Sequence, residues 1–96
     1  MIVTQIDDTY VIALGYEAVT QTMEVASHFP VPECSVCVRR YAGVPIESFD
    51  AALALRGMML DFKLYGISQR YPNPYFKVMS RDEFTIYASR HEQAAA

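Results

Sequence analysis

The stretch Tyr10-Val11-Ile12-Ala13-Leu14 decides how the rest of this sequence is interpreted. It shows no alternation of apolar and polar residues, which is typical of a strand covered on both of its faces. We therefore expect it to lie at the centre of a β-sheet. The run before it, Ile2 to Ile6, is also rich in strand-forming residues. Asp7-Asp8 separates the two runs and tolerates the left-handed backbone of a tight turn, so residues 2–14 are predicted to form a hairpin.

The next segment, Gly15 to His28, fits two periodicities. Its apolar residues recur at the helical spacing i, i+3, i+7 and i+10 from Tyr16, but Met23 and Val25 also fit the period of a strand. A helix is preferred because Glu17 suits a helix N-terminus and a proline at residue 30 would end the helix. The strand remains the alternative.

Two later segments are predicted to be strands. Cys34 to Tyr41 is rich in β-branched residues and lies between Pro32 and Gly43. Tyr75 to Met79 follows Ser68 to Pro74, a segment with two prolines whose preceding residues are forced into extended geometry. We expect residues 68–74 to form a stiff loop rather than a helix.

The clearest helical segment runs from Ser48 to Tyr65. The Ser48 hydroxyl can accept hydrogen bonds from the first turn, and Gly66 is a typical helix stop. Gly57 lies in the middle, where glycine costs about 1 kcal/mol relative to alanine, so we expect another part of the molecule to approach the backbone there.

The C-terminal segment begins with Ser80-Arg81-Asp82-Glu83, which has the spacing of a capping box. Phe84, Tyr87 and Ala88 then share one helical face, so a helix is predicted. The alternative is a strand over residues 84–88 in which Phe84 and Ala88 point inward together. Residues 93–96 are expected to fray.

Taken together, these elements predict the α+β class. We expect a two-layer sandwich with a mixed, mainly antiparallel sheet of about four or five strands and two or three helices on one face. Residues 1–92 are expected to form a single domain, because 96 residues bury enough surface for one core. The 52% apolar and 20% charged residues exclude a disordered chain.

The charges are distributed unevenly. The net charge is −3, but residues 1–38 contain five acidic residues and no lysine or arginine, whereas the remainder carries eight cations and six acids. This polarity favours a protein partner over nucleic acid. No apolar run approaches the roughly 20 residues needed to cross a bilayer, and no secretory signal is recognisable, so no membrane association and a cytoplasmic location are expected.

Cys34 and Cys37 form a C-x-x-C motif. A redox pair needs its first thiol near a helix N-terminus, whereas this motif opens a predicted strand, where residues three apart point to opposite faces. A zinc site would recruit His28 and His91, but this order and spacing match no common ligand pattern. The preferred interpretation is two small core side chains, with metal or thiol chemistry as the alternative.

No arrangement in the sequence indicates catalysis. His28 and His91 are the residues that titrate near neutral pH, but neither stands in a recognisable pattern with a nucleophile and an orienting carboxylate. No glycine-rich phosphate loop is present, and Asp7-Asp8 is interpreted as a turn rather than a cation site. We therefore expect a protein that is not an enzyme and needs no cofactor.

Two groups of residues interleave cations with aromatic rings, a combination that can bind phosphates and stack on bases. The acidic pI of about 5.2 argues against nucleic acid, which remains a second alternative. The groups are Arg39, Arg40 and Tyr41, and Arg70, Tyr71, Tyr75 and Lys77.

The composition favours protein binding. Seven tyrosines, six arginines and five methionines stand against two lysines, as in the cores of protein interfaces. Tyr65, Arg70, Tyr71 and Tyr75 cluster around the predicted stiff loop, which would lose little freedom on binding. The sequence therefore predicts a small protein-binding regulator or inhibitor that occupies a surface of a larger protein, with a homodimer as a possible assembly.

Overall fold

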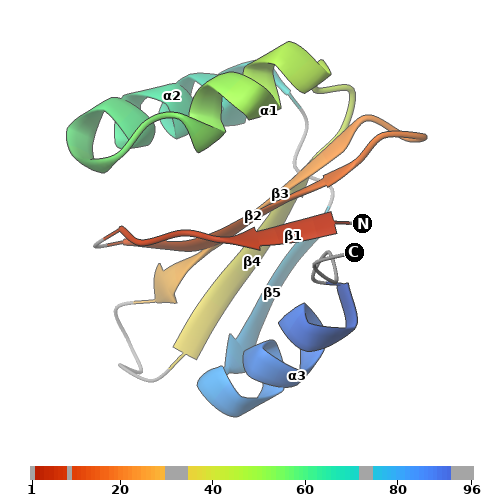
Figure 1. The fold of residues 1–96 in the computed structure, drawn as a ribbon, viewed down its shortest axis with the longest axis vertical. Coiled ribbons are helices and arrows are strands. Elements are labelled where there is room, and N and C mark those ends of the chain that lie inside the picture. Colours follow the sequence, from red (N-terminus) through yellow and green to blue (C-terminus); the bar gives the residue numbers. More distant parts are fainter. Residues whose placement is uncertain (1, 9, 30–34, 72–74, 92–96) are drawn as a thin grey trace.

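A five-stranded sheet forms the middle of the molecule, with helices on both sides (Figure 1). The computed structural model describes residues 2–8, 10–29, 35–71 and 75–91. All neighbouring strands are antiparallel and lie in the order of the sequence, from β1 to β5. The strands are β1 (Ile2–Gln5), β2 (Val11–Glu17), β3 (Thr22–Phe29), β4 (Ser35–Tyr41) and β5 (Tyr75–Ser80), and the helices are α1 (Ile46–Leu53), α2 (Gly57–Arg70) and α3 (Arg81–His91).

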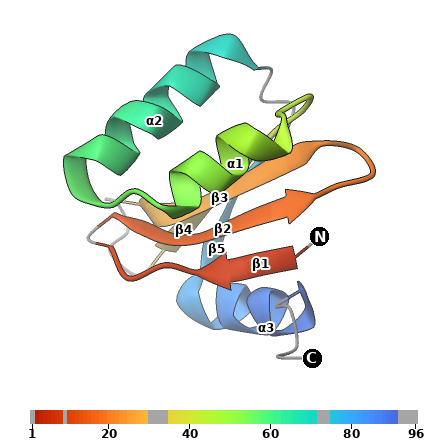
Figure 2. The same cartoon turned by 45° about the horizontal axis from the view of Figure 1, so that its top comes forward.

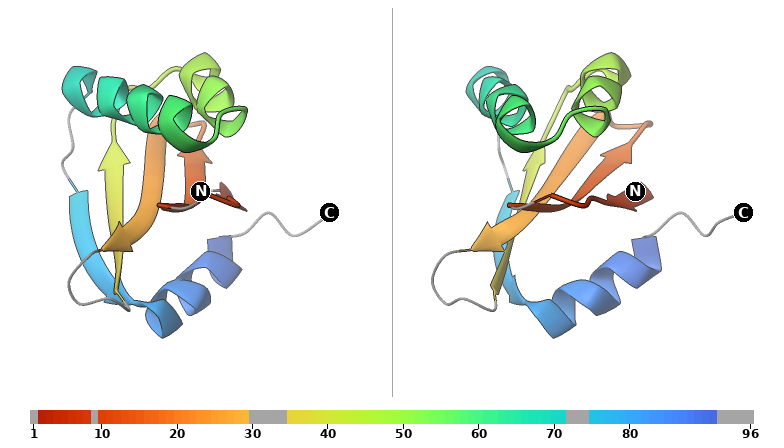
Figure 3. Two further views of the ribbon diagram at one scale, coloured as in Figure 1. Left: turned by 90° about the vertical axis from the view of Figure 1, so that its left-hand side faces the viewer. Right: turned by 60° about the vertical axis from the view of Figure 1, so that its left-hand side comes forward.

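The predicted α+β class is confirmed, with one difference in the layers. α1 and α2 lie side by side on one face of the sheet, but α3 lies on the opposite face, so the fold has three layers rather than two (Figures 2 and 3). The reason is that both faces of the sheet are apolar. Val36 and Val38 point to the α3 side and belong to a separate buried cluster with Phe84 of α3. A sheet with two apolar faces needs a cover on each.

The predicted N-terminal hairpin is confirmed. β1 and β2 pair in the register Gln5 with Ala13, and Asp8 closes the turn by accepting hydrogen bonds from the amides of Tyr10 and Val11 at 3.2 and 3.3 Å. β2 lies between β1 and β3, as expected for a strand covered on both faces. Ala13 is buried under α3, and its neighbour Leu14 is fully buried under α1 and α2.

The helix predicted over residues 15–28 is wrong. β2 continues to Glu17, a turn follows, and β3 occupies residues 22–29. Met23 and Val25 point to the core beneath α1 and α2, whereas Glu24 and Ala26 point to the α3 side. All four are buried, so the alternation that marks a strand is hidden by burial on both faces.

The long helix predicted from Ser48 to Tyr65 is divided in two. α1 ends at Leu53, and α2 begins at Gly57, whose φ of +61° suits only glycine well. No other atom lies within 4 Å of the position that a Cβ at Gly57 would occupy, so its role is conformational and the predicted close approach is absent. Gly66 does not end the helix, which continues to Arg70 and includes the first part of the predicted loop. Residues 72–74 of that loop lie outside the described residues.

The predicted capping box of α3 is confirmed, and the alternative strand over residues 84–88 is wrong. The Glu83 amide donates to Ser80 Oγ at 3.1 Å, and the Ser80 amide donates to Glu83 Oε1 at 3.3 Å. These reciprocal bonds satisfy amides that the first turn of a helix leaves unpaired. Phe84 and Ala88 of the helix are buried against the sheet. The predicted frayed tail, residues 93–96, lies outside the described residues.

Two buried clusters therefore stabilise the fold, one on each side of the sheet. The cluster under α1 and α2 also contains a ring stack between Tyr16 and Phe49, with centroids 5.0 Å apart, and a 2.6 Å hydrogen bond from the Tyr16 hydroxyl to the Val44 carbonyl. That cluster is Ile6, Val11, Leu14, Tyr16, Met23, Val25, Tyr41, Val44, Phe49, Ala52, Leu60 and Ile67. The cluster under α3 is Val3, Ala13, Ala26, Val36, Val38, Met79, Phe84 and Ala88.

Candidate interaction surface

α2 exposes an apolar stripe on the side where a surface helix is usually polar. Only Leu60 and Ile67 of this helix are fully buried. The stripe follows the i, i+4, i+7 spacing of one helical face. Its members are Met58, Phe62 and Tyr65, each about two-thirds exposed, with Met59 beside them. Contiguous exposed apolar residues of this kind mark interaction sites more often than isolated ones do.

A groove of about 280 Å³ runs between α2 and the sheet, beside Tyr65. Arg39 and Tyr41 of β4 form part of its floor, so the fold brings three of the sequence-predicted site residues together. Tyr41 is buried, and burial raises the pKa of its phenol. Tyr10, which is 62% exposed, stands at the same groove. The complete lining is Tyr10, Val11, Val25, Ser27, Arg39, Tyr41, Asp61, Leu64, Tyr65 and Ser68.

Arg39 connects this groove to the edge of the sheet. Its guanidinium lies 5.4 Å from the ring centroid of Phe76, its cross-strand partner on β5. Phe76 is 53% exposed, and Val78 two residues further along the same face is also exposed. Tyr10, Arg39, Tyr65, Phe76 and Val78 are called the α2–β5 surface below. It combines one aliphatic side chain with aromatic rings and a guanidinium, and the last two kinds of group often dominate binding energy in protein interfaces.

Arg70 and Tyr71, the residues at the centre of the sequence-based hypothesis, line a different groove. It measures about 220 Å³, lies between α1 and α2, and also includes Phe62. Tyr71 is half-buried and packs against the larger core, whereas Arg70 is exposed in the last turn of α2. α2 is thus a ridge with a groove on each side, and the predicted aromatic residues are divided between the two grooves.

Arg40, Tyr75 and Lys77 lie on the α3 side of the sheet. Adjacent residues of a strand point to opposite faces, so the pair Arg39-Arg40 does not form a single basic patch. The Arg40 guanidinium stacks 4.3 Å from the Tyr75 ring centroid and forms a 2.9 Å ion pair with Glu24. Because Arg40 is already engaged with a carboxylate, it is a poor candidate for binding phosphates. Lys77 is exposed on edge strand β5.

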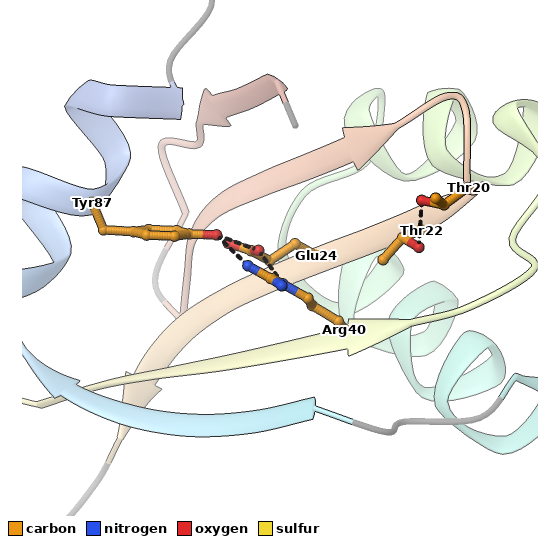
Figure 4. A network of polar contacts seen from close by, with 5 residues as sticks. All are labelled: Thr20, Thr22, Glu24, Arg40 and Tyr87. Carbon is orange, nitrogen blue, oxygen red and sulfur yellow. Dashed lines mark hydrogen bonds and ion pairs between the residues drawn. The ribbon is translucent and has the colours of Figure 1, made fainter.

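Glu24, Arg40 and Tyr87 form a polar network between the sheet and α3 (Figure 4). The Arg40 Nε donates to Glu24 Oε2 at 2.9 Å, and the Tyr87 hydroxyl donates to the same oxygen at 2.5 Å. Arg40 Nη2 also donates to the Tyr87 hydroxyl oxygen at 2.9 Å. The network therefore pairs a carboxylate that is only 2% exposed, and it ties α3 to β3 and β4.

The electrostatics of this network favour the protonated phenol and the charged guanidinium. Burial, together with the hydrogen bond to Glu24, raises the pKa of Tyr87 to about 12. Burial acts to lower the pKa of Arg40, but its hydrogen bonds to Tyr87 and Glu24 outweigh that effect and raise it. Neither group is available to exchange protons at neutral pH. The network is therefore structural rather than acid–base machinery.

Asp8 has a second role that the sequence did not reveal. Besides closing the hairpin, its Oδ1 accepts a 2.7 Å hydrogen bond from the amide of Gly57, the first residue of α2. Arg56, the N-cap residue of α2, makes no side-chain capping bond. Asp8, 49 positions before Gly57 in the sequence, caps the helix instead. That bond, offset in part by desolvation, lowers the pKa of Asp8. A carboxylate held by three backbone amides is explained without a bound cation.

The structure gives no support to a shared site for the thiols and imidazoles. Cys37 is buried, and burial raises the pKa of its thiol. His28 pairs with Val36 and therefore shares the α3-side face, whereas Cys37 points to the other face. Cys34 and the side chain of His91 lie outside the described residues. Among the residues that are described, no group of three or more metal-ligating side chains occurs.

A further cavity, of about 400 Å³, lies between α3 and the sheet. Among the described residues, its lining combines apolar side chains with Gln5, Thr85, Ser89 and the guanidinium of Arg81. The lining residues are Gln5, Ile12, Val36, Arg81, Phe84, Thr85, Ala88 and Ser89.

Comparison with known proteins finds no family model, no curated protein and no solved structure that matches this chain. Within the described part of the chain, none of the helices has the length and apolar character needed to cross a membrane.

Proposed function

We propose that this protein is a small, non-catalytic binding module that regulates or inhibits a larger protein by occupying one of its surfaces. The observation that supports this proposal is the α2–β5 surface, where Tyr65 and Arg39 stand exposed at a groove and the exposed Phe76 ring lies against Arg39. Aromatic and guanidinium groups bury much area and give directional contacts at modest cost in conformational entropy.

The mechanism is steric. Tyr65 and Phe76 would insert into apolar pockets of the partner, and Arg39 would pair with a carboxylate between them. Arg39 is held against the Phe76 ring, so it loses less freedom on binding than an unsupported side chain would. The acidic segment, residues 1–38 with a net charge of −5, would orient the approach of a partner carrying a basic region.

Partner recovery with matched variants tests this proposal. Tagged wild type, the double variant Arg39→Ser/Tyr65→Ala and the control Ile86→Ala are each incubated with lysate of the native cell, and bound proteins are quantified by mass spectrometry. Ile86 is an exposed apolar residue on α3, so its loss removes similar surface on the opposite side of the molecule.

We expect one partner that wild type and the control recover equally and that the double variant recovers at least about 30-fold less, since a single hot-spot residue contributes about 2 kcal/mol or more. The free energy of unfolding in urea should change by less than about 1 kcal/mol in both variants, the loss of the Arg39–Phe76 contact included. Equal recovery by the double variant would exclude the α2–β5 surface as the binding site.

Two expectations belong to the same proposal, a cytoplasmic site of action and self-association. The second is tested by light scattering of the purified protein over a range of concentrations. A mass of 10.9 kDa throughout corresponds to a monomer, and a concentration-dependent rise towards twice that mass to a homodimer.

A further inference from the structure

β5 offers an open backbone edge at the α2–β5 surface. It pairs with β4 on one side, and within the described residues no other strand lies beside its outer side (Figure 3). Alternate residues of an edge strand direct their amide and carbonyl groups away from the sheet, and these groups can pair with another extended chain. β5 has six residues, against four in β1 at the other edge of the sheet.

Along β5, exposed apolar side chains on one face alternate with a charged side chain on the other, so a paired strand would contact both kinds. Phe76 and Val78 are exposed on the side that carries α2, and Lys77 between them is exposed on the α3 side. A strand laid along this edge would place every second side chain against Phe76 and Val78 and the intervening one opposite Lys77. The edge therefore selects an apolar–X–apolar pattern in its partner.

The charges along β5 determine what X should be. Lys77 stands in the middle of the strand, and Arg39 lies across Phe76 near its start. The acids nearest in sequence, Asp82 and Glu83, come after the strand, in the first turn of α3. On the α2 side Arg39 shares its groove with Asp61, whereas Lys77 is the charge that the middle of β5 exposes on the α3 side, which favours a carboxylate opposite Lys77.

The same lysine argues against a second copy of this chain as the occupant. In a symmetric antiparallel pair centred on Lys77, the two ammonium groups would lie directly opposite each other, and like charges at that position are destabilising. Lysines on edge strands commonly prevent self-pairing in this way. The positive charge of Lys77 therefore disfavours pairing with a second copy of this chain and favours pairing with an acidic strand.

We infer that β5 binds an extended acidic segment of the partner protein as a sixth strand, with apolar side chains against Phe76 and Val78 and a carboxylate opposite Lys77. This inference rests on the proposed function and specifies how the α2–β5 surface is used. Backbone pairing supplies affinity, and the alternating side chains supply specificity.

Synthetic peptides test the inference directly. The probe is the capped heptapeptide Ser-Thr-Val-Glu-Val-Thr-Ser, which places two valines on one face and the glutamate on the other. One control carries lysine in place of the glutamate. A second control is N-methylated at alternate backbone positions, so that it keeps all side chains but cannot form the strand ladder. Binding is followed by amide chemical shifts of the ¹⁵N-labelled protein during titration.

We expect the shifts to concentrate on β5 and β4, with the glutamate peptide binding about threefold more tightly than the lysine peptide, as one cross-strand charge pair allows. Lys77→Glu should reverse that order, and Lys77→Thr should abolish it. The N-methylated peptide should not bind. Equal binding of the N-methylated peptide, identical affinities of the two charged peptides, or no shifts with any peptide at millimolar concentration would each overturn the inference.

The outcome is separable from that of the proposed function. A partner lost with Arg39→Ser/Tyr65→Ala but retained undiminished by Lys77→Glu would leave the binding module in place and exclude strand addition. If both variants recovered the partner as well as wild type does, the proposed binding surface and the strand addition would both be excluded. Increased dimerisation of Lys77→Thr in light scattering, without binding of the acidic peptide, would assign the edge to a second copy and contradict the inference.

Discussion

The two faces of the sheet are covered in different ways. On one face, α3 is attached by a small apolar cluster and by the network of Glu24, Arg40 and Tyr87. On the other face, α1 and α2 cover a larger apolar cluster, but only Leu60 and Ile67 of α2 are fully buried, and its outer stripe is apolar. One face thus uses polar groups for internal attachment, whereas the other leaves apolar groups in contact with solvent.

This difference separates residues that stabilise the fold from residues that are free to bind. Arg40 and Arg39 are adjacent in sequence, yet Arg40 is committed to Glu24 within the molecule and Arg39 stands beside an exposed ring. Adjacent positions of a strand point to opposite faces, so the same residue type has different neighbours at positions 39 and 40. Substitutions on each face can break or sharpen that division.

Truncating Leu14 should cause the largest loss of stability. This fully buried side chain lies in the cluster under α1 and α2, so Leu14→Ala should lower the free energy of unfolding by about 3 kcal/mol or more. Val38→Ala, at a fully buried position under α3, removes fewer atoms and should cost about 2 kcal/mol. Urea unfolding measures both. A larger loss for Val38→Ala would show that the α3 face contributes more to stability.

Removing the charge of Glu24 should have the next largest effect. Glu24→Gln keeps one acceptor oxygen but removes the carboxylate charge that pairs with the Arg40 guanidinium in a buried position. Breaking a fully buried pair costs about 3–5 kcal/mol, and because Arg40 is a third exposed we expect about 2 kcal/mol here. Glu47→Gln, at an exposed glutamate in the first turn of α1, is the control and should change stability by less than about 0.5 kcal/mol. Similar effects of the two variants would contradict a structural role for the network.

Tyr87→Phe should cost about 1 kcal/mol at neutral pH and should also change the response to alkaline pH. The pKa of Tyr87 is raised to about 12 in the folded protein from an ordinary value of 10. A raised pKa stabilises the folded state below pH 10, and this contribution is lost as the pH rises towards 12. Wild type should therefore lose more stability than Tyr87→Phe between pH 10 and 12.

Tyr16 and Tyr41 also have pKa values raised by burial, so the variant should retain part of the slope. Thermal unfolding at a series of alkaline pH values measures the difference. Parallel pH profiles for wild type and Tyr87→Phe would show that the phenol does not stabilise the α3 face through its hydrogen bonds.

Local signals made part of this fold predictable from sequence. The hairpin turn at Asp7-Asp8 and the capping box of Ser80 and Glu83 depend on residues a few positions apart, and both are confirmed. β3 was predicted only as the alternative to a helix, because residues on both of its faces are buried and its apolar residues also fit a helical period. The break between α1 and α2 differs from the prediction because Gly57, interpreted as a close approach within one helix, has a positive φ and begins a second helix that Asp8 caps from the hairpin.

The candidate surface could be predicted only in part, because the exposure of its residues depends on how distant segments pack together. Composition identified tyrosine and arginine as binding groups, and Tyr65 and Arg39 do lie at one groove. The exposed Phe76 and Val78 received no weight, because their exposure follows from the position of β5 at the sheet edge. Glu24 and Arg40 are cross-strand partners only in the observed register, which sequence does not specify.

Asp8→Ala should destabilise the α1–α2 face by about 1 kcal/mol, the usual cost of losing a helix cap. The pKa of Asp8 is lowered by its hydrogen bond to the Gly57 amide, so its contribution is present at neutral pH and is lost as the pH falls through the folded-state pKa, below the ordinary value of 3.8. Asp7→Ala, at the exposed neighbouring turn residue, is the control. Hydrogen exchange should show faster opening of α2 in Asp8→Ala only, and equal rates would contradict tertiary capping.

The smallest effect on stability should come from the exposed stripe of α2. Met59→Gln/Phe62→Gln replaces apolar side chains that are about two-thirds exposed, so the free energy of unfolding should change by less than about 0.5 kcal/mol. Ile86→Gln on α3 is the matched control on the other face. If the stripe is kept apolar for contact with another molecule, the double variant should weaken partner recovery while the control does not. A loss of stability near 2 kcal/mol in the double variant would instead assign these side chains to the core, and the contrast between the two faces would lose its functional meaning.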